Sequence, residues 1–211
     1  PEQRSVPTGP GTEGDYLTDR LTDHAVDMLH RQKNGPFFLS LWYHTVHTPI
    51  EGKSELVDHY RKKITGRHRQ RNPHYAAMVH SMDENVGRVL AKLDDLGLRQ
   101  NTLVVFSSDN GGFTRFCKLN KGLQVANNTP LRSGKGSCYE GGIRVPLIVR
   151  GPGVSANKEC STPVISCDLF HTFLDAAQID LGYTRVEAPL TGVTSLRDVD
   201  EGALLAELAT S

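Results

Sequence analysis

The chain has 211 residues, with 24 basic and 24 acidic side chains, so its formal net charge is zero. A balanced charge gives no reason to expect nucleic acid as a partner, and no apolar run approaches the roughly 20 residues that a membrane-spanning helix needs. The four cysteines form no Cys-x-x-Cys pair, which excludes a zinc ribbon and a thioredoxin-type redox motif.

The first elements can be predicted from composition and periodicity. Residues 1–14 are rich in proline and glycine and contain neither an initiator methionine nor a signal segment, so we expect an irregular start cut from a longer polypeptide. Apolar side chains at helical spacing predict an amphipathic helix over 15–32. After Gly35 and Pro36, the run FFLSLWY has no helical period and predicts a buried strand over 37–43.

A second helix is predicted over residues 75–96. Asn72 is its expected N-cap, Pro73 suits the first helical position, and Gly97 ends it. One face of this helix is expected to be apolar and to consist of Val79, Met82, Val86, Val89, Leu93 and Leu96. The run TLVVFSS then predicts a strand over 102–108.

A long polar connection follows, from about 110 to 142. It exceeds the roughly 12 to 15 residues at which a structureless loop becomes unusual, so we expect it to be functional or disordered. A strand is predicted over 145–150, and Asp168 is the expected cap of a final helix. This order predicts an α/β domain with the three strands in one largely parallel sheet and the helices at 15–32 and 75–96 packed on it. Ligands of such sheets collect beyond the carboxyl ends of the strands.

Asp109 and Asn110 stand where the second predicted strand ends, before two glycines. Asp-Asn-Gly is favourable turn chemistry, so a simple strand-end turn is one explanation. A carboxylate beside an amide carbonyl is also a suitable partial ligand set for a hard cation such as calcium. The pair predicts either a turn or part of a metal site.

His44 and His47 follow the first predicted strand. On an extended strand, residues three apart point to opposite faces, which makes this pair a poor metal chelate. Pro49 favours an extended Thr48 and so places His47 at the strand exit, where its imidazole could serve as an acid or a base. A structural role for both histidines is the alternative.

Lys135 lies between two glycines in the long connection. Glycines let the backbone approach a ligand closely and leave the ammonium group free to meet an oxyanion, although an exposed turn lysine is the alternative. Thr129 occupies the first glycine position of a Walker A loop, and Gly136 follows the lysine, so a phosphate loop of that kind is excluded. No Gly-x-Ser-x-Gly elbow of a serine hydrolase occurs.

The basic run RKKITGRHRQR, residues 61–71, carries seven cationic or titratable side chains. Such runs between ordered elements are usually solvated loops. The alternative is that this run attracts a polyanion.

Taken together, in their order and spacing, the segments at 37–49, 75–112, 130–153 and 168–179 resemble the later part of a sulfatase catalytic domain. The resemblance covers about residues 15–196, and the segments resemble those of arylsulfatase-like and N-acetylgalactosamine-6-sulfatase-like enzymes. It implies the alkaline phosphatase-like α/β fold, a mixed and mostly parallel sheet between helices, of which this chain holds a part.

The organisation that the resemblance implies has three parts. Residues 1–14 form an irregular segment, residues 15–190 form the C-terminal portion of the catalytic domain, and residues 191–211 form a tail that leads toward a further C-terminal region.

The resemblance also implies roles for the candidate site residues. Asp109 and Asn110 match the calcium-binding pair of the family. His47 matches its active-site histidine, which protonates the departing alkoxide, and Lys135 matches the lysine that touches the sulfate and the leaving oxygen. His44 is expected to contact the substrate together with these two residues.

The nucleophile of the family is a formylglycine made from the first residue of Cys/Ser-x-Pro-Ser-Arg. The nearest match, SVPTG at residues 5–9, lacks the Ser-Arg pair. We therefore expect the nucleophile and the remaining metal ligands to lie in an upstream segment, and we expect these 211 residues to be inert alone.

The expected reaction is hydrolysis of a sulfate ester, preferably on a sugar, by an exported or lysosomal enzyme, with calcium as the metal. Two alternatives stay open. One is a phosphodiesterase or phosphatase of the same superfamily, although such relatives bind zinc and show Asp-His where this chain has Asp109-Asn110. The other is a noncatalytic module that binds sulfated glycans through residues 61–71. Asn127, Asn128 and Thr129 also form a glycosylation sequon, a triplet that often arises by chance.

Overall fold

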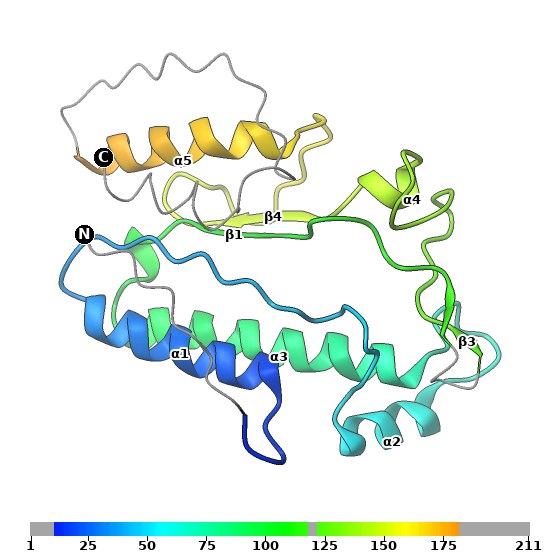
Figure 1. Cartoon of the computed structure of the whole chain (residues 1–211). Coiled ribbons are helices and arrows are strands. Elements are labelled where there is room, and N and C mark those ends of the chain that lie inside the picture. Colours follow the sequence, from blue (N-terminus) through cyan, green and yellow to red (C-terminus); the bar gives the residue numbers. More distant parts are fainter. Residues whose placement is uncertain (1–10, 118–121, 182–211) are drawn as a thin grey trace. The chain divides into compact units, whose positions relative to one another are not determined.

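The computed structural model describes residues 11–117 and 122–181 (Figure 1). Contacts divide this part of the chain into two compact units. The larger unit contains residues 11–33 and 41–152, apart from the undescribed stretch, and the smaller unit contains residues 34–40 and 153–181. The predicted segment 1–14 is described only from residue 11, and the predicted tail at 191–211 lies outside the described residues.

Three helices form one side of the larger unit. Helix α3 (Pro73–Asp95) packs against both α1 (Leu17–Gln32) and α2 (Ser54–Lys63). The predicted ends of α3 are confirmed, because the Asn72 side chain accepts hydrogen bonds from the backbone N–H groups of the second and third helical residues, and Gly97 adopts a φ of 72°. Helix α2 was not predicted, and its last turn contains the first three residues of the basic run at 61–71.

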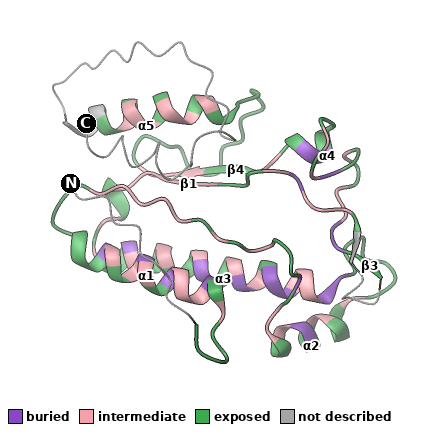
Figure 2. Ribbon diagram, in the orientation of Figure 1, coloured by how far each residue is buried: buried purple, intermediate pink, exposed green. Residues whose placement is uncertain are grey.

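Figure 2 shows the buried positions along α1 and α3, and the residues at these positions are more polar than predicted. In α1 the buried residues are Thr18, Thr22, Ala25 and Leu29. In α3 they are Pro73, Ala77, Met78, Ser81, Asn85 and Leu93. Of the predicted apolar face of α3, Leu93 is buried, whereas Val79 is 38% exposed. Small and hydrogen-bonded side chains occupy the contact, as where Asn85 of α3 donates to the carboxylate of Asp19 on α1 at 2.7 Å.

The predicted sheet is only partly correct. Strand β1 (Val104–Ser107) pairs with β4 (Leu147–Arg150), but the two strands run antiparallel, with Val105 opposite Val149. The predicted strand at 37–43 is irregular, because no described segment offers it a backbone to pair with. The order of elements supported the α/β class, which is confirmed, but it did not determine the direction in which the strands pair.

The long connection between β1 and β4 contains short regular elements. Strands β2 (Phe116–Cys117) and β3 (Leu123–Gln124) form an antiparallel pair, and α4 (Glu140–Ile143) is a single helical turn. A 3-10 turn at Arg99–Asn101 links α3 to β1.

The smaller unit is built around α5 (Ser166–Leu181). The predicted cap, Asp168, lies in the first turn of this helix, and its carboxylate accepts a hydrogen bond from the backbone N–H of Ile165 at 2.8 Å. Phe173 of this helix packs against Phe38, with ring centroids 6.4 Å apart. In the part of the chain that the structure describes, no helix is long and apolar enough to cross a membrane.

Candidate active site

The segment that carries His44 and His47 is fixed by side chains of α1. The hydroxyl of Thr22 lies 2.8 Å from that of Tyr43, and the hydroxyl of Thr18 is hydrogen-bonded to that of Thr45. Both threonines of α1 are buried. Because buried hydroxyl groups need partners, these bonds hold the segment at defined points along the helix.

The two histidines are exposed and lie in a turn, not on a strand. The backbone N–H of His47 donates to the carbonyl of His44 at 2.8 Å, and the two rings meet edge to face with centroids 5.2 Å apart. The prediction that they point to opposite faces is therefore wrong, because it assumed an extended backbone. His47 Nδ1 lies 3.1 Å from the carbonyl oxygen of Thr48 and 3.3 Å from the hydroxyl of the same residue, so it can donate to the first or accept from the second.

Asp109 and Asn110 follow the end of β1, as predicted. The side-chain amide of Asn110 donates to the carbonyl of Gly111 at 3.2 Å, which leaves its Oδ1 available as an acceptor. Asp109 is exposed, and among the described residues its carboxylate has no hydrogen bond or ion pair. In residues 11–117 and 122–181, no three His, Cys, Asp or Glu side chains gather as a metal site. The pair alone thus offers two oxygen-bearing groups.

Lys135 is half-buried, and its backbone N–H donates to the carbonyl of Gly112 at 3.0 Å. Its ammonium group has no hydrogen bond or ion pair within the described residues. A Cβ on Gly134 would lie less than 3.0 Å from that same carbonyl oxygen of Gly112. The glycine before the lysine therefore lets its loop reach the loop of Asp109.

Asn128 is the residue that the sequence analysis missed, since it was considered only as part of a sequon. Its amide nitrogen lies within hydrogen-bonding distance of three carbonyl oxygens, at 3.0 Å from Gly112, 3.1 Å from Ser133 and 2.9 Å from Gly141. The only sequence signal for this contact is the glycine pair in each loop, at 111–112 and 141–142. Glycine pairs permit backbones to approach closely, and Gly111 N–H donates to the carbonyl of Gly142 at 2.9 Å.

A hydrophobic cluster joins the histidine turn to these loops. Ile50, Met78 and Val125 are buried together, and Val46 and Phe113 pack against them. Val46 precedes the active-site histidine candidate, and Phe113 follows the glycine pair that comes after Asn110. The segments that carry His47, Asp109 and Lys135 are therefore linked to one another within the larger unit.

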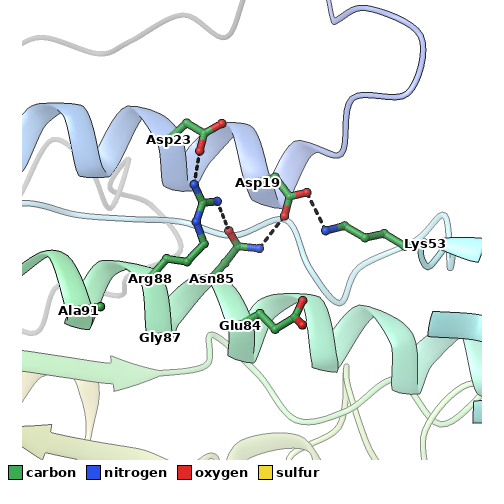
Figure 3. A pocket seen from close by; sticks show the side chains of 8 residues that line it. All are labelled: Asp19, Asp23, Lys53, Glu84, Asn85, Gly87, Arg88 and Ala91. Carbon is green, nitrogen blue, oxygen red and sulfur yellow. Dashed lines mark hydrogen bonds and ion pairs between the residues drawn. The ribbon is translucent and has the colours of Figure 1, made fainter. Parts of the chain in front are cut away.

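A charged network on α1 and α3 fixes the chain just beyond the histidine turn (Figure 3). Lys53 Nζ lies 2.7 Å from a carboxylate oxygen of Asp19, and the amide of buried Asn85 donates to the other at 2.7 Å. Arg88 donates to the Asn85 carbonyl oxygen at 2.9 Å and pairs with Asp23. Partial burial acts to raise the pKa of Asp19, but the hydrogen bonds from Lys53 and Asn85 and the charges of Lys53 and Arg88 outweigh it and lower that pKa.

This network lines a pocket of about 670 Å³. Its remaining charged side chain, Glu84, accepts a hydrogen bond at 3.1 Å from His80. Because its charged groups already have partners, the pocket has little left with which to bind an ion.

The sequence model of the sulfatase family matches residues 2–179, and the chain belongs to this family. It is 37% identical to a sulfatase of Formosa agariphila, with 82% of this chain and 32% of that protein covered. It is 37% identical to the steryl-sulfatase of Rattus norvegicus, with 81% of this chain and 28% of that protein covered. It is 33% identical to the N-acetylgalactosamine-6-sulfatase of Mus musculus, with 76% of this chain and 29% of that protein covered.

Among solved structures, the chain is similar to Ps i-CgsB in complex with k-i-k-neocarrahexaose. The identity is 37%, the TM-score is 0.67, and 85% of this chain and 37% of that one are covered. The chain spans about a third of the length of the relatives that it matches.

Proposed function

We propose that this chain forms part of a sulfuric ester hydrolase and supplies its acid, its sulfate-binding lysine and part of its metal site. One observation carries the proposal beyond family membership. The loops with Asp109 and Lys135 share the Gly112 carbonyl through backbone and Asn128 contacts, and the hydrophobic cluster of Val46 and Phe113 joins the turn of His47 to them. These contacts link three segments that are distant in sequence, which supports a shared site for their side chains.

Each proposed role follows from the chemistry of the group. A sulfate ester carries its charge on peripheral oxygens, so the Lys135 ammonium group, which has no partner among the described residues, can stabilise that charge. His47, protonated on Nε2, donates a proton to the departing alkoxide. His44, whose ring contacts that of His47, is proposed to contact the substrate beside it.

Asp109 and Asn110 fit calcium better than zinc. Both offer oxygen donors, and the Asn110 amide is oriented with its nitrogen on Gly111, so its oxygen remains free for a cation. A bound divalent cation would add positive charge next to the sulfate oxygens. The donor set also disfavours the zinc phosphodiesterase alternative.

The nucleophile is proposed to come from outside these 211 residues. No Cys/Ser-x-Pro-Ser-Arg motif occurs in the sequence. We propose that residues 15–190 are the later part of a catalytic domain, with residues 1–14 and 191–211 leading into other parts of the protein, and that the 211 residues alone do not turn over substrate.

A sugar sulfate is the preferred substrate. Support comes from the similarity to an N-acetylgalactosamine-6-sulfatase and to a structure solved with neocarrahexaose. The steryl-sulfatases among the relatives support a small apolar sulfate as the second candidate. Exported or lysosomal localisation is proposed on family membership alone.

The test is turnover of p-nitrophenyl sulfate and of a sulfated oligosaccharide by the protein that carries these residues together with an upstream formylglycine motif. Asp109→Ala and Lys135→Ala are each expected to lower kcat/KM on the order of a hundredfold. A calcium chelator should lower kcat/KM as Asp109→Ala does. Asp58→Ala, on exposed α2, is the matched control and should leave turnover unchanged. Undiminished turnover in the Asp109 and Lys135 variants, or phosphodiester hydrolysis in place of sulfate hydrolysis, would contradict the proposal.

A further inference from the structure

A second pocket, of about 390 Å³, lies in the larger unit between the loop that follows α2 and the β2–β3 region. Figure 1 shows α2 and β3 at the same end of α3. The pocket is lined by Arg67, His68, Arg69, Gln70, Arg71, Gly122, Leu123, Gln124, Ala126 and Asn127. Among the described residues that line it, the titratable side chains are three arginines and one histidine and none is acidic, so the hollow has a positive potential.

Two of the basic groups are held in place by the backbone. The guanidinium of Arg71 donates to the carbonyls of His68 at 2.9 Å and of Gly66 at 2.7 Å. The backbone N–H of Thr65 donates to His68 Nδ1 at 3.0 Å, so the proton of the neutral ring is on Nε2, which is a donor. These contacts fix the two side chains, and none of them neutralises the charge of Arg71.

Arg67 and Arg69 have no hydrogen bond or ion pair among the described residues. In this they differ from most of the other arginines among the described residues. Seven of these form an ion pair with a carboxylate: Arg20, Arg31, Arg61, Arg88, Arg99, Arg144 and Arg150. A hollow lined by unneutralised guanidinium groups is suited to an anion from outside the chain.

The pocket shares a segment with the candidate active site. Gln70, in its wall, exchanges two hydrogen bonds with the backbone of Asn127, at 2.9 and 3.0 Å. The next residue, Asn128, donates to the carbonyl of Gly112, which also accepts from the backbone of Lys135. The basic pocket and the proposed sulfate-binding lysine are therefore tied to the same short stretch of chain.

We propose that this pocket binds a sulfate group on a sugar next to the one that is hydrolysed, so that the enzyme prefers sulfated oligosaccharides. The proposal rests on the proposed function. Sulfate oxygens accept paired hydrogen bonds from a guanidinium fork, and the volume falls within the roughly 300–1000 Å³ usual for small-ligand sites. The described residues that line the pocket include no Phe, Tyr or Trp, so they offer no stacking surface of the kind expected for single-stranded nucleic acid.

The experiment measures binding of a labelled heparin-derived hexasaccharide to the 211-residue chain at low salt. The double variant Arg67→Gln/Arg69→Gln is expected to raise Kd about tenfold or more. The control Arg31→Gln/Lys33→Gln also removes two positive charges, but from exposed positions at the end of α1. It should change Kd less than about twofold. Desulfated hexasaccharide should not bind, and a single-stranded oligonucleotide of equal charge should bind more weakly.

Equal weakening by the two double variants would overturn the proposal, because it would show attraction to overall charge only. Absence of hexasaccharide binding, or tighter binding of the oligonucleotide, would also overturn it. Failure of the proposed function is distinguishable. In the enzyme with the formylglycine motif, the Arg67/Arg69 variant should raise KM for the oligosaccharide and leave turnover of p-nitrophenyl sulfate unchanged. A protein that is no sulfatase would turn over neither substrate, but it could still bind the hexasaccharide.

Discussion

The two parts of the candidate active site are held in different ways. The histidine turn is anchored by several side chains, because the hydroxyls of Thr18 and Thr22 fix it from α1 and Val46 and Ile50 fix it in the hydrophobic cluster. The loops of Asp109 and Lys135 are held by contact between glycine backbones and by one amide, that of Asn128. The histidine turn, held by several side chains, tolerates the loss of one contact. The loops of Asp109 and Lys135 are in backbone contact, which leaves no room for even a methyl group.

The largest effect is expected at Gly111. A Cβ there would lie well under 3.0 Å from the carbonyl of Gly141, which is backbone and cannot rotate away. Gly111→Ala should lower the free energy of unfolding by about 3 kcal/mol, measured by urea denaturation. Gly87→Ala is the control, because nothing lies within 4 Å of its Cβ position inside α3, and it should stabilise by about 0.5–1 kcal/mol. Equal midpoints for wild type and Gly111→Ala would show that the loops do not need this contact.

A smaller effect is expected when one contact is removed from the loops of Asp109 and Lys135, or one from the histidine turn. Asn128→Ala leaves three backbone carbonyls without their shared donor and should cost about 2 kcal/mol. Thr22→Val keeps the shape of the side chain and removes the partner of the Tyr43 hydroxyl, and it should cost about 1 kcal/mol because other contacts hold the turn. The urea midpoints of the two variants measure this comparison. A larger loss of stability in Thr22→Val than in Asn128→Ala would contradict the claim that several contacts share the anchoring of the histidine turn.

The sequence predicted elements whose signals are local. Asn72, Pro73 and Gly97 mark α3 by backbone chemistry that acts within a few residues, and both ends are correct. Helix α2 was missed because its sequence is mostly polar and Val57 is its only buried residue.

Features that depend on distant segments could not be predicted in this way. The antiparallel direction of β1 and β4 and the three carbonyls around Asn128 depend on chain segments brought together by folding. Residue chemistry alone marked Asp109, His47 and Lys135 as candidates, each with a structural alternative, and the resemblance to a family gave them their roles. The glycine pairs in two loops are a signal for close approach, but they do not say which segments meet.

The smallest expected effect concerns the ion-paired side of the histidine turn. The folded-state pKa of Asp19 is lowered, so its charged form contributes stability that is fully present above the unfolded pKa, about 3.9, and is lost as pH falls through the folded pKa. Asp19→Asn removes this dependence, since an amide does not titrate. The difference in unfolding free energy between wild type and Asp19→Asn should be constant above about pH 5 and shrink steadily below about pH 4. Urea denaturation at several pH values measures it, with Asp27→Asn, whose ion pair with Arg31 is exposed, as the control. A difference that does not change in acid would mean that Lys53 and Asn85 hold the neutral and charged forms of Asp19 equally, and that the anchoring of the histidine turn owes nothing to this charge.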